Sequence, residues 1–136
     1  MRVTVICGMV PPANAPEGVT ALMLAGRLAR AGCEVTLLTS REFAQGLPPA
    51  WQDARVEFRP DVRDWTWRGL PSLRRALRRS RPDAVVLIYI GYLYRYHPMI
   101  TFLPTLCRCL KPRLNRACQR ILVAPVTMQI QPVAFI

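Results

Sequence analysis

The sequence predicts an α/β fold in which helices cover a mostly parallel sheet. Short apolar runs rich in β-branched residues alternate with segments whose apolar residues recur at helical spacing. The runs are nearly continuous in apolar side chains, as expected for strands buried on both faces of a sheet. Alternation of strand and helix favours right-handed crossovers and therefore parallel pairing. The 136 residues are enough for a domain with a core of its own.

The first β–α–β unit is expected within residues 1–40. Residues 3–7 form a β-branched apolar run that Gly8 ends, and residues 34–38 form a second run. Between them, a helix is expected to begin at Pro16 and to stop at Gly32. Its apolar stripe consists of Ala21, Leu24, Ala25 and Leu28.

Three further strands are expected in the rest of the chain. Residues 84–89 form the clearest buried run, which Pro82 precedes. Residues 55–58 indicate a weaker third strand, and residues 121–124 indicate a fifth strand that Pro125 stops.

Two helices are expected between these later strands. In residues 70–81 leucines recur at helical spacing and arginines cover the far side. A second, apolar helix is expected over residues 99–110, with a kink at Pro104. Together the elements predict a single Rossmann-like three-layer domain over residues 1–136. Because residues 121–136 are mostly apolar, we expect the sheet to be incomplete at the C-terminus.

Composition and charge argue against several functional classes. Lys and Arg total 19 against 8 acidic residues, a formal net charge of +11, but all except Lys111 are Arg and they are scattered. No nucleic-acid-binding motif accompanies the charge, so nucleic acid is not the expected partner. The five cysteines lack the spacing of a disulfide framework and indicate a reducing compartment. Cys107 and Cys109 would face different sides of a helix, so no metal site is expected.

The chain is expected in the cytoplasm, with peripheral binding at the inner membrane face left open. The first apolar run is short for a signal peptide, and no uncharged apolar stretch reaches the roughly 18 residues of a spanning helix. The arginine-rich helix at 70–81 and the apolar helix at 99–110 suit docking on anionic lipid. A solvated basic face and a buried core helix are the plainer interpretation.

Three segments carry a resemblance to a known family. The first segment is the opening strand and helix, which contains Pro11-Pro12 and in which Leu28-Ala29-Arg30-Ala31-Gly32 precedes Glu34-Val35. The second segment is RPDAVVLIYI, and the third is RILVAP. In this order and spacing the chain resembles the amino-terminal half of glycosyltransferases with the GT-B fold, in particular the family-four class. Other classes of nucleotide-binding Rossmann-like proteins are less favoured, because the sequence contains neither Gly-x-Gly-x-x-Gly nor a P-loop pattern.

The resemblance implies transfer of a sugar from a nucleotide-sugar donor to a glycan or a lipid-linked acceptor. In the family, the amino-terminal domain mainly holds the acceptor, and the carboxy-terminal domain grips the donor nucleotide with Arg, Lys and a Glu-x7-Glu pair. Glu34 and Glu42 have that spacing, but they lie in the amino-terminal half, whereas the family's pair lies in the carboxy-terminal half. No catalytic residue is therefore assigned. The chain is therefore expected to need no cofactor and to be inactive until a missing half or a partner chain supplies the donor site.

Five residues are candidates for substrate binding. Glu17 and Gly18 lie where the first loop meets the first helix, whose N–H groups suit a phosphate or a sugar hydroxyl. Tyr92, Tyr94 and His97 follow the fourth strand, at the carboxyl end of the sheet where open α/β folds bind ligands. The plainer interpretation is that Glu17 only begins the helix and that the tyrosines pack on neighbouring helices.

Two alternative functions stay open. The chain could be a non-catalytic subunit of a two-chain transferase that binds the acceptor or docks on a membrane, which predicts a hetero-oligomer. It could also be an unrelated Rossmann-like module that binds an anion or nucleic acid, which predicts steep salt dependence. The residues do not determine the donor sugar, the acceptor, the stereochemistry of transfer or the oligomeric state. They also do not determine whether the chain is a fragment, a split subunit or the product of a decayed gene.

Overall fold

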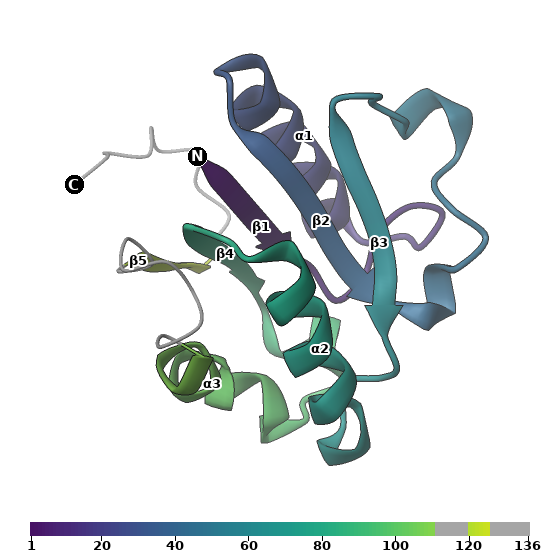
Figure 1. Cartoon of the computed structure of the whole chain (residues 1–136). Helices are drawn as coiled ribbons and strands as arrows, with labels where there is room; N and C mark the ends of the chain where they lie inside the picture. The colour runs from purple at the N-terminus through teal and green to yellow at the C-terminus, as the bar shows by residue number, and fades with distance from the viewer. Residues whose placement is uncertain (111–119, 126–136) are drawn as a thin grey trace.

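A parallel sheet forms the centre of the fold (Figure 1). The computed structural model describes residues 1–110 and 120–125, and within them five strands pair in the order β3-β2-β1-β4-β5. Each of the four pairings is parallel. The strands are β1 (Arg2–Ile6), β2 (Glu34–Ser40), β3 (Val56–Val62), β4 (Ala84–Tyr89) and β5 (Arg120–Pro125). The predicted α/β class is confirmed, whereas the predicted incompleteness concerns residues 126–136, which lie outside the described residues.

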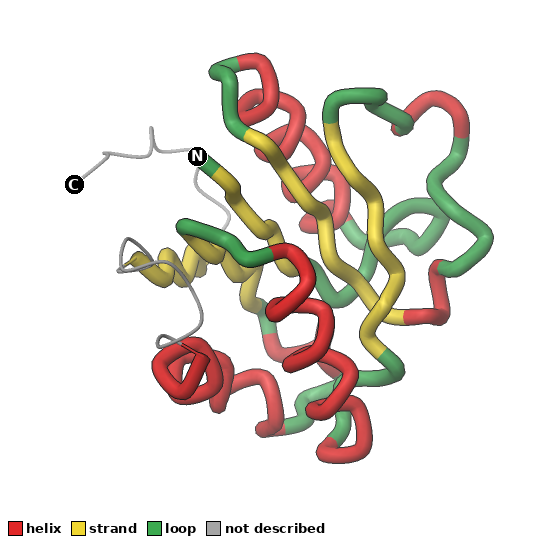
Figure 2. Tube along the Cα trace, in the orientation of Figure 1, coloured by secondary structure: helices red, strands yellow, loops and turns green. Residues whose placement is uncertain are grey.

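Helices cover the sheet on both faces, which confirms the three-layer prediction. Helix α1 (Pro16–Arg30) lies behind the sheet in Figure 1, and α2 (Leu70–Ser80) and α3 (Leu103–Leu110) lie in front. The connection from β2 to β3 contains only the short 3-10 turns η1 (Arg41–Phe43) and η2 (Pro49–Trp51), which Figure 2 shows as brief red segments. Among the described residues, none of the helices combines the length and the hydrophobicity that spanning a lipid bilayer requires.

The ends of α1 follow from local chemistry. Pro16 is the first helical residue, where its missing N–H costs nothing. At the other end, Gly32 has φ +91°, a conformation that glycine adopts without strain. The Gly32 N–H donates to the Ala29 carbonyl at 3.1 Å and the Cys33 N–H donates to the Leu28 carbonyl at 3.1 Å. These two bonds form a Schellman motif and confirm that the helix stops at Gly32.

The core lies between the sheet and the helices. Ala21 and Ala25 of the predicted α1 stripe are fully buried, whereas Leu24 and Leu28 are only partly buried. The face of α1 that touches the sheet is thus made of small residues, which let the helix axis approach closely. On the opposite layer, Leu73 and Leu77 of α2 are fully buried, as the leucine spacing predicted.

The predicted helix over residues 99–110 is wrong in its first part. Residues Pro98–Phe102 form the 3-10 turn η5, and the α-helix begins only at Leu103. Pro104 is therefore in the first turn of α3, not at a kink in a helix interior. The first turn tolerates proline because its N–H would lack an intrahelical partner anyway.

Candidate functional site

The candidate site lies at the carboxyl end of the sheet, where β1 and β4 are neighbours. The chain leaves β1 toward β2 and leaves β4 toward β5, so the two connections diverge. Open α/β folds bind ligands outside the strand ends at such a switch point. Here the bordering segments are the loop from β1 to α1 and the 3-10 turn η4 (Gly91–Tyr94) that follows β4. We call this place the switch-point site.

A hydrogen bond between Glu17 and Tyr92 joins the two sides of the switch-point site. The Tyr92 hydroxyl donates to Oε2 of Glu17, although the two residues are 75 positions apart. This bond, together with burial and the negative charge of Glu17, raises the pKa of Tyr92 to about 12. Tyr92 therefore stays a neutral donor near pH 7. The carboxylate can accept about four hydrogen bonds, and no other described side chain donates to it.

Gly18 supports the site through close packing of the backbone. A Cβ atom at this buried position would lie 2.5 Å from the Met9 carbonyl oxygen and 2.9 Å from the Val10 Cα. The glycine therefore lets the start of α1 press against the loop that follows β1. Its N–H donates to the Ala15 carbonyl at 3.0 Å, so this N–H already has a partner.

Tyr94 lies in the core under the switch-point site and does not line its surface. Its side chain is 0% exposed, and its hydroxyl donates to the Ile88 carbonyl at 2.6 Å. The Trp65 ring meets the Tyr94 ring edge to face at 4.9 Å, and the indole N–H donates to the Gly8 carbonyl at 3.3 Å. Tyr94 was expected to contact a substrate, but its ring is buried and its hydroxyl already has a hydrogen-bond partner. These contacts suit a residue that supports the site from the core.

His97 belongs to an aromatic cluster that it forms with Trp67 and Phe102. Its Nδ1 accepts a hydrogen bond from the Met99 N–H at 3.1 Å, which caps η5. Its ring lies 5.5 Å from the Trp67 ring, which in turn lies 5.1 Å from the Phe102 ring. Trp67 is 48% exposed and Phe102 is 49% exposed. Sequence reasoning missed these two residues, and the only signal for Trp67 was a large aromatic residue in a loop before a helix.

The loop after η4 has strained backbone. Arg95 and Tyr96 have φ values of 53° and 56°, in the left-handed region that side chains other than glycine seldom adopt. The Tyr96 N–H donates to the Gly91 carbonyl at 2.8 Å, and the Arg95 guanidinium pairs with Glu42 at 3.2 Å. Such strain of about 1–3 kcal/mol per residue persists where surrounding contacts hold it, and it concentrates at functional sites.

Two further findings concern the Cys7 thiol and the potential metal ligands of the described residues. Burial raises the pKa of the Cys7 thiol to about 11, and the thiol donates to the Met9 carbonyl at 3.1 Å. Cys7 therefore stays protonated near pH 7 and is a poor nucleophile. Across residues 1–110 and 120–125, no group of three or more His, Cys, Asp or Glu side chains could hold a metal ion.

Two hollows in the described surface lie away from the Glu17–Tyr92 pair. One, of about 390 Å³, borders the aromatic cluster and is lined by Arg63, Asp64, Thr66, Trp67 and Arg68. The other, of about 90 Å³, lies between β3 and α2. Neither hollow is lined by Glu17 or Tyr92.

Comparison with known proteins identifies one family. The sequence model of a family described as a glycosyl transferase 4-like domain matches residues 17–120, about three quarters of the chain. The match begins at Glu17 and includes α1, α2, α3 and the segment with Tyr92. No curated protein and no solved structure matches the chain significantly.

Proposed function

Since the chain belongs to the glycosyl transferase 4-like family, we propose that it is the acceptor-side domain of a glycosyltransferase. The observation that carries this proposal is the Glu17–Tyr92 hydrogen bond across the switch-point site. A sugar presents several hydroxyl groups close together, each of which can both donate and accept. A carboxylate with unused acceptor capacity beside a phenol oxygen that can still accept is suited to bind such a group.

The charge of the site favours an acceptor over the diphosphate of a nucleotide donor. A helix N-terminus attracts anions, but in α1 the carboxylate of Glu17 already occupies the first turn. A second anion there would be repelled by this carboxylate. We therefore place the donor nucleotide on a second domain or on a partner chain, and we expect the 136-residue chain to show no sugar transfer on its own.

Replacing Glu17 by glutamine is expected to weaken acceptor binding by tenfold or more. The change keeps the shape of the side chain but removes the charge, and hydrogen bonds to charged groups contribute about 1.5–3 kcal/mol. The probe is an array of oligosaccharides, followed by calorimetric titration of the glycan that the wild-type chain retains most strongly. Tyr92→Phe removes the donor to Glu17 and should weaken binding less.

Glu34→Gln is the matched control for this experiment. It removes the same charge, but Glu34 is exposed and is the first residue of β2, at the amino ends of the strands and so opposite the switch-point site. Its affinity should stay within twofold of the wild type. Retention of no glycan by the wild-type chain, or equal losses in the two glutamine variants, would contradict the acceptor-side role.

A second candidate role, docking on an anionic membrane, is favoured by the aromatic cluster. Trp67 and Phe102 expose about half of their side chains, and Arg63 and Arg68 line the hollow beside Trp67. Exposed aromatic rings next to basic residues suit the interface of an anionic bilayer. In this role the domain would lie beside a lipid-linked acceptor.

Docking through this cluster predicts that Trp67→Ala/Phe102→Ala reduces sedimentation with phosphatidylglycerol vesicles at least fivefold. Binding of the wild-type chain should also fall as salt is raised, because salt screens the arginines. Trp51→Ala is the control, since Trp51 is 37% exposed but belongs to η2, outside the aromatic cluster. Failure of the wild-type chain to bind at low salt, or equal losses in control and double variant, would rule the docking role out.

A further inference from the structure

A small cleft between α2 and the edge of the sheet is distinct from the switch-point site. It has a volume of about 90 Å³ and is lined by Arg41, Asp61, Ser72, Arg75, Ala76 and Arg79. Arg41 directly follows β2, Asp61 belongs to β3, and the other four belong to α2. We call it the arginine cleft. None of its lining residues is a candidate for acceptor binding.

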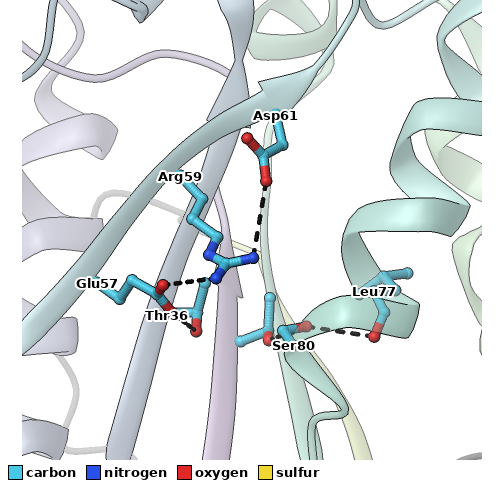
Figure 3. Close-up of polar contacts among 7 residues, drawn as sticks. Thr36, Glu57, Arg59, Asp61, Leu77 and Ser80 are labelled. Carbon is cyan, nitrogen blue, oxygen red and sulfur yellow. Dashed lines mark hydrogen bonds and ion pairs between the residues drawn. The ribbon is translucent and has the colours of Figure 1, made fainter.

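The arginines of the cleft have no partner within the described part of the chain. Arg41, Arg75 and Arg79 form neither an ion pair nor a side-chain hydrogen bond there. The single carboxylate in the cleft is Asp61, and it already lies 3.9 Å from the Arg59 guanidinium. Figure 3 shows Arg59 and Asp61 on β3, with α2 opposite them. Three arginine side chains thus line the cleft, together with one carboxylate that also pairs with Arg59.

The spacing on α2 explains why these groups face the same hollow. Ser72, Arg75, Ala76 and Arg79 are at positions i, i+3, i+4 and i+7, which form one stripe of a helix. Ala76 is buried, and its small side chain lines the cleft together with the two arginines. Arg74 and Arg78 on the same helix are exposed but do not line the cleft.

We propose that the arginine cleft binds a phosphate group. Guanidinium groups are planar forks that match the oxygens of phosphate, and several of them around one hollow add their attraction. The cleft, with a volume of about 90 Å³, has room for one tetrahedral oxyanion beside these side chains. The phosphate belongs either to a free anion or to the headgroup of a lipid.

Inorganic phosphate is the probe for the first experiment. The full 136-residue chain is titrated with phosphate at constant ionic strength, with chloride as the balancing anion, and amide shifts and thermal stability are followed. Arg75→Gln/Arg79→Gln removes two charges from the cleft. Arg74→Gln/Arg78→Gln removes two charges from the same helix outside it and serves as the matched control.

The cleft variant is expected to lose at least tenfold in phosphate affinity, and the control should stay within twofold. Asp61→Asn should tighten binding several-fold, because it removes the one negative charge that faces the anion. This gain of affinity cannot result from a misfolded variant. Equal losses in both double variants would show that only the general positive charge acts. Either this result or no phosphate binding by the wild-type chain would overturn the proposal.

A second experiment separates the two sources of phosphate. Vesicles of phosphatidylcholine with phosphatidic acid are compared with vesicles of phosphatidylcholine alone. If the wild-type chain binds the vesicles with phosphatidic acid, if free phosphate reverses this binding and if the cleft variant does not bind, the cleft is assigned to a lipid headgroup. Phosphate binding without such recruitment assigns it to a free anion.

Discussion

Replacing Tyr94 by alanine is expected to lower the free energy of unfolding by about 3–5 kcal/mol, as for other buried aromatic residues. The ring is fully buried, contacts the Trp65 ring at 4.9 Å and stacks on the Tyr89 ring at 6.0 Å. Its hydroxyl donates to the Ile88 carbonyl in β4 at 2.6 Å. Alanine would leave a cavity under the switch-point site and would also remove this bond.

Two further variants, one at Tyr94 and one at Tyr96, separate the contribution of ring packing to stability from that of the hydrogen bond. Tyr94→Phe keeps the ring and should cost only about 1–3 kcal/mol, the penalty for leaving a buried carbonyl without its donor. Tyr96→Ala should change stability by less than about 0.5 kcal/mol, because its side chain is 81% exposed. Urea denaturation followed by circular dichroism measures all three. A loss below 1 kcal/mol in Tyr94→Ala would show that this ring is not part of the core.

Gly8→Ala is expected to destabilise the chain by about 1–3 kcal/mol and to open the switch-point site. A Cβ atom here would lie 2.1 Å from the Leu93 carbonyl oxygen and 2.7 Å from its carbon. Both are backbone atoms of η4, so the turn must move away from β1 to relieve the overlap. Because Tyr92 is in the same turn, its hydrogen bond to Glu17 should be lost.

Gly26→Ala is the matched control and should have the opposite sign. Gly26 lies within α1, and the nearest atom to an added Cβ would be Oδ2 of Asp53 at 3.4 Å, an ordinary contact. Alanine in place of glycine inside a helix should stabilise the chain by about 0.5–1 kcal/mol. Denaturation curves give the stabilities, and the amide spectrum of Tyr92 reports the site. Equal stabilities of the two alanine variants would show that Gly8 is not tightly packed.

Local chemistry explains why much of the fold could be predicted from the sequence. Pro16 and Gly32 mark the ends of α1 by backbone geometry alone, and the leucines of α2 face the core at their regular spacing. Pro104 was misread because a proline that begins a helix and one that interrupts it look the same without knowledge of where the preceding turn ends. That boundary depends on how η5 packs, which is a tertiary property.

The positions of the candidate residues in the fold could be predicted from the sequence, but their contacts could not. Glu17 and Tyr92 could both be assigned to the carboxyl edge, but their contact requires β1 and β4 to be neighbours. Tyr92 and Tyr94 lie in the same short turn, and Tyr94 points inward because Trp65, Tyr89 and the Ile88 carbonyl contact it there. The arginine cleft joins the end of β2, β3 and α2, so no single stretch of sequence contains its pattern.

The most direct test of the acceptor-side role is to map where a glycan binds on the isotopically labelled 136-residue chain. The chain is titrated with the oligosaccharide that it retains most strongly on the array, and backbone amide shifts are followed by NMR. We expect the largest shifts at Gly8, Glu17 and Tyr92, and their absence in Glu17→Gln. Shifts confined to α2 or to residues 63–68, with the switch-point amides unchanged, would contradict the proposed function.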